Sequence, residues 1–221
     1  MNLKSRLSIA FILCLFSLFV FGFLAYFIHG HDIIHFDHHV ISFVQAMESA
    51  WLTSIMKLLS FIGSAPVIIV FSLFVLFFLY KVLKHRYELI LFIAVMAGSP
   101  FLNGILKEWF ERARPDFHRL VDISGYSFPS GHAMNAFTFY GMVTFLLWRH
   151  IPVRRGRTAL LLFSGVMIIG IGLSRIYLGV HYPTDIIGGY FASATWLGFS
   201  ILSFQWFKDR QTHKYTRFGT S

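Results

Sequence analysis

Residues 174–185 read Ser-Arg-Ile-Tyr-Leu-Gly-Val-His-Tyr-Pro-Thr-Asp, and this stretch lies between two long apolar segments of the chain. Within twelve residues it contains an arginine, a histidine and an aspartate, which are Arg175, His181 and Asp185. Charged and titratable residues are costly in a membrane-embedded chain unless they have a chemical role or reach water. A simple turn between two helices does not need them. We therefore expect the stretch to belong to a functional site between two membrane helices.

The composition of the whole chain is that of an integral membrane protein. Of its 221 residues, 56% are hydrophobic, 19% are aromatic and only 13% are charged, which is too few charges to cover a soluble globule. Several apolar runs approach the roughly 20 residues that a helix needs to cross a bilayer. We expect one all-α domain over residues 1–221, built as a bundle of six transmembrane helices at Leu7–Ile28, Ala65–Leu83, Tyr87–Leu106, His132–Trp148, Thr158–Leu173 and Ile186–Phe207.

The distribution of lysine and arginine predicts the orientation of the bundle. With the N-terminus inside, the cytoplasmic segments hold 13 of the 19 basic residues, whereas eight of the ten acidic residues fall on the other side. Both termini are therefore predicted to be cytoplasmic, in a multi-pass protein of the cell membrane. The net charge of +9 reflects this topology and anionic lipid headgroups rather than a nucleic-acid surface, and we expect no nucleic-acid partner and see no sign of an obligatory protein partner.

The segment 31–63, between the first two spans, has apolar residues at helical spacing. We expect one or two helices that lie along the outer interface, with Trp51 as an anchor. Residues 29–39, which include the start of this segment, are rich in ionisable side chains: His29, His31, Asp32, His35, Asp37, His38 and His39. Histidines four residues apart have the spacing of a metal site, but polar residues at a wet interface explain the pattern without a metal. We assign no metal ligand and no cofactor.

The third predicted span ends in the first motif, Lys107-Glu108-Trp109-Phe110-Glu111-Arg112-Ala113-Arg114-Pro115. If the helix continues until Pro115 stops it, Lys107 and Arg114 lie two turns apart on one face, over about 10 Å, which suits a dianion. The alternative is a pair of basic side chains that reach for water at a helix end, neutralised by neighbouring acids.

The second motif, Pro129-Ser130-Gly131-His132, comes directly before the fourth predicted span. Serine is a favoured N-cap, and the start of a helix presents free backbone N–H groups and a positive dipole end to an anion. Gly131 would allow a ligand to approach the backbone. An ordinary turn and cap is the alternative, but an ionisable ring such as His132 at the start of a membrane span favours a functional role.

The third motif is the opening stretch. Pro183 is well suited to be the first residue of the last helix, which places Asp185 in the first turn and His181 just before it. The Asp185 carboxylate can then reach one ring nitrogen of His181, fix the tautomer and leave the other nitrogen as a nucleophile. The alternatives are a helix-dipole partner for Asp185 and an interfacial anchor for Arg175.

The predicted topology brings the three motifs to the same side of the membrane, because complete spans separate them and two crossings return the chain to its starting side. Together they offer three cations, a serine hydroxyl with nearby N–H donors, and two histidines as bases. This inventory suits phosphoryl transfer, in which catalysis is mostly positioning and stabilisation of charge. The expectation fails if the two histidines are too far apart to reach one phosphorus.

The three motifs resemble the signature of the type 2 phosphatidic acid phosphatase superfamily, which has lysine, six residues and Arg-Pro, then Pro-Ser-Gly-His, then Ser-Arg, five residues, histidine, three residues and aspartate. All three match without departure and in the family's order. In size and layout the chain is most similar to the bacterial phosphatidylglycerophosphate phosphatases and undecaprenyl pyrophosphate phosphatases of that superfamily. The resemblance implies a metal-independent phosphatase with a phosphohistidine intermediate.

The resemblance also implies a role for each motif residue. His181 is the nucleophile, Asp185 orients its ring, and His132 protonates the leaving oxygen and then activates water. The phosphate is held by Lys107, Arg114, Ser130, Gly131 and Arg175. A site at the outer headgroup level implies a lipid phosphate substrate such as phosphatidylglycerophosphate, phosphatidic acid or undecaprenyl pyrophosphate.

Three other functions remain open from the sequence. A lipid phosphotransferase would pass the phosphoryl group to an acceptor other than water. A proton-coupled transporter would need ionisable residues near the bilayer midplane, whereas here they gather at one end of the spans. A non-catalytic scaffold that binds lipid headgroups would leave His132, His181 and Asp185 without a role.

Overall fold

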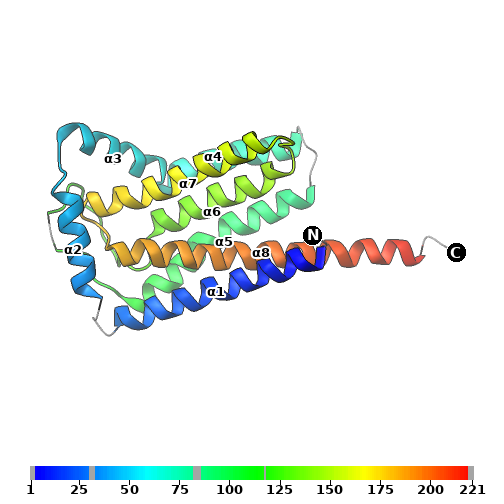
Figure 1. The fold of residues 1–221 in the computed structure, drawn as a ribbon, viewed down its shortest axis with the longest axis horizontal. Coiled ribbons are helices and arrows are strands. Elements are labelled where there is room, and N and C mark those ends of the chain that lie inside the picture. The colour runs from blue at the N-terminus through cyan, green and yellow to red at the C-terminus, as the bar shows by residue number, and fades with distance from the viewer. Residues whose placement is uncertain (1–2, 30–32, 82–85, 117, 219–221) are drawn as a thin grey trace.

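The computed structural model describes residues 3–29, 33–81, 86–116 and 118–218, and every regular element in these ranges is an α-helix. The helices are shown in Figure 1 and are α1 (Leu3–His29), α2 (Ile34–Gln45), α3 (Ala50–Ile62), α4 (Ala65–Lys81), α5 (Arg86–Phe110), α6 (Gly131–Trp148), α7 (Arg154–Tyr177) and α8 (Pro183–Phe218). The predicted all-α class is confirmed. The six segments expected to span the membrane fall in α1, α4, α5, α6, α7 and α8, except that the last two residues of the second segment, 82 and 83, lie outside the described residues.

Four helices of the described chain are long and apolar enough to cross a membrane, judged by length and composition. They are at Ser8–Ile28, Tyr87–Phe110, Arg154–Tyr177 and Pro183–Arg210. A fifth candidate is the bent pair formed by α3 and α4, whose axes differ by 54° at a short break. α6 does not meet the same criterion, so the count of six spans stays a prediction.

α6 is the central helix of the bundle and packs against α4, α5, α7 and α8. The main apolar core surrounds it and includes the fully buried Phe92, Val95, Met142 and Ile171. α1 lies along α8 on the side away from α4 and α7 (Figure 1). Large apolar side chains cover the outside of the bundle, among them Phe19, Phe74 and Val166, each about two-thirds exposed. An apolar exterior around an apolar core is the pattern of a helix bundle in lipid.

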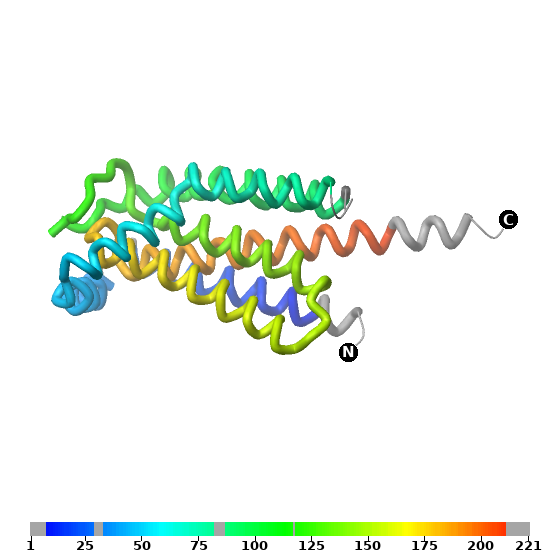
Figure 2. Tube along the Cα trace, turned by 90° about the horizontal axis from the view of Figure 1, so that it is seen from above, coloured from blue at the N-terminus to red at the C-terminus, as the bar shows by residue number. Residues whose placement is uncertain are grey.

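α2 and α3 lie across one end of the bundle, opposite the start of α1 and the far end of α8 (Figures 1 and 2). The described part of the predicted segment, residues 33–63, thus forms two helices, as expected, although its position relative to a membrane stays a prediction. α2 packs on α7 and α8, and α3 packs on α7. Trp51, the predicted anchor, is 75% exposed at the start of α3. The loops that contain the three motifs lie at this same end.

Two glycines allow the chain to close up around the motifs. Gly179, in the turn after α7, has a φ of +72° and lies against the His118 backbone. Gly189 in α8 lies against the start of α6. A Cβ added at Gly189 would be only 3.0 Å from the Ser130 backbone carbonyl oxygen and 3.1 Å from the Ala133 Cβ. A side chain at Gly189 would push α6 and α8 apart where the second and third motifs meet.

Candidate active site

The third motif forms the turn between α7 and α8. α7 ends at Tyr177, four residues beyond the end of the predicted span. α8 begins at Pro183, as the sequence predicts, so Asp185 lies in the first turn of α8. The Asp185 Oδ2 atom is 3.2 Å from His181 Nδ1 and accepts a hydrogen bond of 2.9 Å from the Tyr182 backbone N–H. His181 and Asp185 are fully buried. The expected contact between the histidine and the carboxylate is therefore present.

Two neighbours select one tautomer of His181. Arg114 Nη1 lies 3.2 Å from His181 Nε2, and a guanidinium has only donors. The Nε2 atom must therefore accept, which leaves the ring proton on Nδ1, where it is donated to Asp185. Burial lowers the pKa of His181 to about 4, although contact with Asp185 acts in the opposite direction. At neutral pH the ring is uncharged, and the single lone pair of Nε2 accepts the hydrogen bond from Arg114.

The first motif is not continuously helical. α5 ends at Phe110, and Glu111 takes a left-handed φ of 44°, which turns the chain away from the helix axis before Pro115 is reached. The prediction that Lys107 and Arg114 lie on one face of a single helix is therefore wrong. The two side chains nevertheless meet, because Lys107 Nζ and Arg114 Nη2 both donate to the Tyr126 backbone oxygen, over 2.8 and 3.0 Å.

Arg114 is held by backbone oxygens. Its guanidinium donates to the carbonyl oxygens of Val180 and Gly125, each at 2.8 Å, and to that of Ser124 at 3.3 Å. Burial lowers the pKa of Arg114, while Asp185 acts in the opposite direction. Within the described ranges, neither Lys107 nor Arg114 takes part in an ion pair, so the neighbouring acids do not neutralise them directly.

The second motif caps α6 and is bonded to the third. The Ser130 Oγ atom accepts from the Ala133 N–H at 3.4 Å, and the Ser130 backbone N–H donates to the Asp185 carbonyl at 3.0 Å. From α5, Asn103 Nδ2 donates to the Pro129 carbonyl at 3.0 Å. The predicted N-cap is therefore present. A Cβ added at Gly131 would lie 3.1 Å from Asn103 Oδ1. The absence of a side chain at Gly131 therefore also allows α5 to pack closely on α6.

His132, in the first turn of α6, is near enough to Arg175, His181, Lys107 and Arg114 to interact with their charges. It is half-buried. The second motif thus contributes a ring to the same cluster that contains the first and third motifs. The predicted convergence of the three motifs at one end of the bundle is what the structure describes.

Arg175 lies in the last turn of α7 and is only 3% exposed, which excludes the alternative of an interfacial anchor. Its Nη1 atom donates to the Ser60 hydroxyl of α3. Its Nε atom is buried and has no hydrogen-bond partner among the described residues. A buried guanidinium with an unused donor is an unfavourable arrangement unless an anion completes it.

Lys107, Arg114 and Arg175 lie close enough together for their charges to repel one another. The site therefore has an excess of positive charge, which a phosphate dianion would balance.

In the described part of the chain, no group of three or more His, Cys, Asp or Glu side chains is placed to hold a metal ion. His31 and Asp32 of the histidine-rich segment lie outside the described residues.

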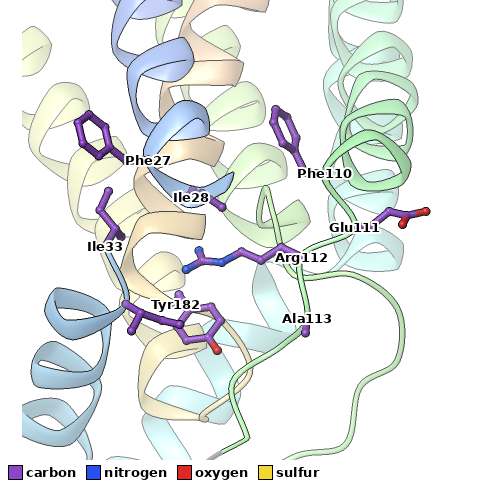
Figure 3. A pocket seen from close by; sticks show the side chains of 9 residues that line it. Phe27, Ile28, Ile33, Phe110, Glu111, Arg112, Ala113 and Tyr182 are labelled. Atoms are coloured by element: carbon purple, nitrogen blue, oxygen red, sulfur yellow. The ribbon is translucent and has the colours of Figure 1, made fainter. Parts of the chain in front are cut away.

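Sequence reasoning missed two charged residues at this site, Arg112 and Asp37. Arg112 donates to Asp185 Oδ1 at 2.6 Å and to Asp37 Oδ2 at 2.7 Å, and its guanidinium stacks on the Tyr182 ring at 4.1 Å. Arg112 also lines a cavity of about 510 Å³ between the ends of α1 and α5 and the start of α2 (Figure 3). In that view the Arg112 side chain reaches inward above Tyr182, whereas Glu111 points away.

A signal for Asp37 exists in the sequence. Asp37, Ile41 and Val44 are spaced by four and three residues, so on a helix they share one face. They are the buried residues of α2. An aspartate on the apolar face of a helix needs a buried partner of opposite charge. Arg112 of the first motif, to which the sequence analysis gave no role, is that partner.

Comparison with known proteins agrees with this geometry. The family model described as "PAP2 superfamily" matches residues 88–209. Phosphatidylglycerophosphatase B of Bacillus subtilis is 33% identical over 180 residues, which are 79% of this chain and 86% of that protein. An undecaprenyl-diphosphatase of Sulfolobus acidocaldarius is 28% identical over 179 residues, 78% of this chain and 80% of that protein.

A solved structure is also similar to this chain. It is the crystal structure of a transmembrane PAP2-type phosphatidylglycerolphosphate phosphatase from Bacillus subtilis, with a TM-score of 0.73 and 31% identity, and the match covers 89% of this chain and 96% of that one. The matched family model spans more than half of the chain and includes all three motifs. The chain therefore belongs to the PAP2 superfamily, among the membrane lipid phosphatases of that family.

Proposed function

We propose that the protein hydrolyses the terminal phosphate of a membrane lipid through a covalent phosphohistidine on His181. The observation that carries the proposal is the pair of hydrogen bonds on the His181 ring. Asp185 holds the Nδ1 proton and Arg114 donates to Nε2, so the lone pair of a buried, neutral imidazole points at a cation. A phosphate bound to Arg114 would lie directly in front of this nucleophile.

The reaction has two steps. In the first, His181 Nε2 forms a bond to phosphorus and the phosphorus–oxygen bond to the lipid breaks. His132, which the bound phosphate dianion keeps protonated at the start of the cycle, donates its proton to the departing oxygen. Asp185 balances the positive charge that develops on the His181 ring. In the second step His132 removes a proton from water, the water oxygen attacks phosphorus, and the phosphorus–nitrogen bond breaks. Inorganic phosphate leaves, and both histidines return to their starting states.

Three cations and a helix start would stabilise the transferring phosphoryl group. Lys107, Arg114 and Arg175 supply positive charge to its equatorial oxygens, and Ser130 and Gly131 supply donors at the start of α6. Removal of one such donor typically lowers kcat by roughly 10²–10³-fold. In this proposal the cations take the part that divalent metals have in other phosphotransfer enzymes.

The substrate is proposed to be a lipid phosphate of the outer leaflet. The distribution of basic residues supports a site on the extracytoplasmic side, since the motif end of the bundle is opposite the basic helix ends. The names of the relatives support phosphatidylglycerophosphate, and secondarily undecaprenyl pyrophosphate, as substrates to test first. The motifs contact only the terminal phosphoryl group and do not distinguish a monoester from a pyrophosphate.

The test is phosphate release from a panel of lipid phosphates by the purified protein in detergent with excess chelator. We expect release to persist in the chelator and to fall at least about 10³-fold in His181→Ala, because no other side chain supplies the nucleophile. Gel filtration of the variant checks that it is folded. Release that requires an added metal, or that survives His181→Ala, would overturn the mechanism.

A further inference from the structure

Asp37, Arg112 and Asp185 form a continuous buried chain of charges. Arg112 donates to Asp37 Oδ2 at 2.7 Å through Nη2 and to Asp185 Oδ1 at 2.6 Å through Nη1. Both carboxylates are fully buried, and the Arg112 side chain is 12% exposed. Asp185 uses its other oxygen to contact His181. The chain of charges therefore leads from α2 to the proposed nucleophile.

Thr184 closes the network into a compact unit. Its backbone N–H donates to Asp37 Oδ1 at 3.0 Å, and its hydroxyl donates to Asp37 Oδ2 at 2.6 Å. The same hydroxyl accepts from Arg112 Nη1 at 2.8 Å. Asp37, which belongs to α2, therefore caps the first turn of α8 by accepting from Thr184, the residue directly before Asp185. Both oxygens of Asp37 and both terminal nitrogens of Arg112 have partners.

We propose that Asp37 and Arg112 are positioning residues for the His181–Asp185 pair, and this inference rests on the proposed function. Arg112 fixes the Asp185 carboxylate so that Oδ2 faces His181, and Asp37 supplies Arg112 with a second anion. Neither side chain contacts the phosphoryl group. Through Asp37, helix α2 thereby helps to position the His181–Asp185 pair.

Charge arithmetic explains why two carboxylates are needed. The unit of Asp37, Arg112 and Asp185 carries one net negative charge, which remains to balance the imidazolium that forms when His181 attacks phosphorus. Without the charge of Asp37 the unit is neutral, and Arg112 competes with His181 for Asp185. Without Arg112, two carboxylates would be left buried without a cation, and one of them would take up a proton.

Two other roles for the network make different predictions. If it only joins α2 to α8, its loss lowers stability and leaves kcat of the folded protein unchanged. If Arg112 binds substrate from the adjacent cavity, its loss raises KM. A positioning role lowers kcat and the rate of phosphohistidine formation, with little change in KM.

The experiment compares Asp37→Asn and Arg112→Lys with wild type, using dioctanoyl phosphatidic acid in detergent micelles. Asparagine keeps the shape of Asp37 but not its charge, and lysine keeps the charge of Arg112 but cannot bridge two carboxylates. The matched control is Glu88→Gln, since Glu88 is also a buried acid between two cations, Arg149 at 2.7 Å and Lys208 at 3.2 Å, at the other end of the bundle. Steady-state rates are combined with rapid alkaline quenching, which traps phosphohistidine.

We expect Asp37→Asn and Arg112→Lys each to lower kcat about 10- to 100-fold, as is typical when a group that orients a catalytic residue is lost. KM stays within about threefold, phosphohistidine forms more slowly by the same factor as kcat, and Glu88→Gln retains wild-type kcat. If Asp37→Asn does not fold, Arg112→Lys decides the question on the same criteria.

A wild-type kcat in both variants, or a rise in KM with kcat unchanged, overturns the positioning role while His181→Ala remains inactive. A loss of kcat in Glu88→Gln equal to that in Asp37→Asn also overturns it, because any buried charge would then have the same effect. Activity in His181→Ala overturns the proposed function itself and with it this inference. The two failures are therefore distinguishable.

Discussion

The His181 ring is surrounded by charged and titratable side chains from several parts of the molecule. Charged and titratable groups face it from several elements: Asp185 of α8, Arg114 of the α5–α6 loop, Arg175 of α7 and His132 of α6. Burial and the two arginines favour the neutral ring, and Asp185 favours the charged ring. Burial is the largest of these effects, so the pKa of His181 lies below its ordinary value.

This balance predicts the titration of His181. Its pKa is about 4 instead of 6.5, so the ring is neutral at pH values above about 5. The ring gains its second proton only in more acidic solution. Because the folded-state pKa is lowered, protonation of His181 opposes folding, so acid should destabilise the protein through this residue. Histidine NMR spectra of wild type and His181→Ala would identify the resonance. A midpoint of 6 to 7 for this resonance would contradict the prediction.

α2 and α3 are the elements that connect the end of the bundle to the proposed phosphate site. α2 supplies Asp37, and α3 supplies Ser60, whose hydroxyl accepts from the Arg175 guanidinium. Gln45 at the end of α2 also donates to the His118 carbonyl at 2.7 Å, and Thr53 of α3 shares a hydrogen bond of 2.8 Å with the Tyr177 hydroxyl. These two helices therefore hold the end of α7 in place from the side.

Loss of the Ser60 hydroxyl should impair phosphate binding by Arg175. In Ser60→Ala a second donor of this buried guanidinium is left without its partner, and we expect kcat/KM to fall about tenfold, since a hydrogen bond to a charged group contributes roughly 1.5–3 kcal/mol. The matched control is Ser72→Ala in α4. Ser60 and Ser72 are each 8% exposed, but within the described residues the Ser72 hydroxyl has no partner.

Equal rates in Ser60→Ala and Ser72→Ala, measured on the same lipid phosphate, would show that Ser60 does not position Arg175. Thermal unfolding of both variants separates an effect on rate from an effect on folding. A loss of stability confined to Ser60→Ala, with an unchanged kcat/KM, would also contradict the prediction.

The helices were predictable from apolar runs of sufficient length, and the start of α8 was predictable from Pro183, because both signals are local. The end of α5 was not, since Glu111 takes a left-handed conformation that no local preference of glutamate indicates. Lys107 and Arg114 therefore meet at the Tyr126 carbonyl through a loop, not along a helix. The partners of Arg112 and Arg175 come from α2 and α3, far away in sequence, and their identity depends on tertiary packing.

At the scale of the whole molecule, the two ends of the bundle differ in their charges. The motif end contains the proposed phosphate site with its buried carboxylates. The other end contains the basic helix ends together with Glu88, Arg149 and Lys208. Both the start of α1 and the end of α8 lie at that second end (Figure 1). The rule that basic segments stay in the cytoplasm predicts that the motif end faces outward.

Site-directed labelling tests this orientation. Cys14 is the only cysteine, so Cys14→Ala provides a background without thiols. Ser124→Cys introduces a thiol in the exposed loop at the motif end, and Arg155→Cys introduces one at the exposed start of α7. A membrane-impermeant maleimide should label Ser124→Cys in intact cells and Arg155→Cys only after permeabilisation. The reverse pattern would place the site on the cytoplasmic side.

The hydrogen bond from Arg114 to His181 Nε2 has a consequence for inhibitor chemistry. In the proposed mechanism the resting protein keeps the His181 lone pair covered by Arg114, and an anion that draws the guanidinium toward itself exposes this lone pair as it binds. A neutral electrophile offers the arginine no such exchange. If His181 is the nucleophile as proposed, covalent inhibitors of this protein need a negatively charged group beside the reactive group, and neutral organophosphates should not inactivate it even at concentrations that inactivate serine hydrolases.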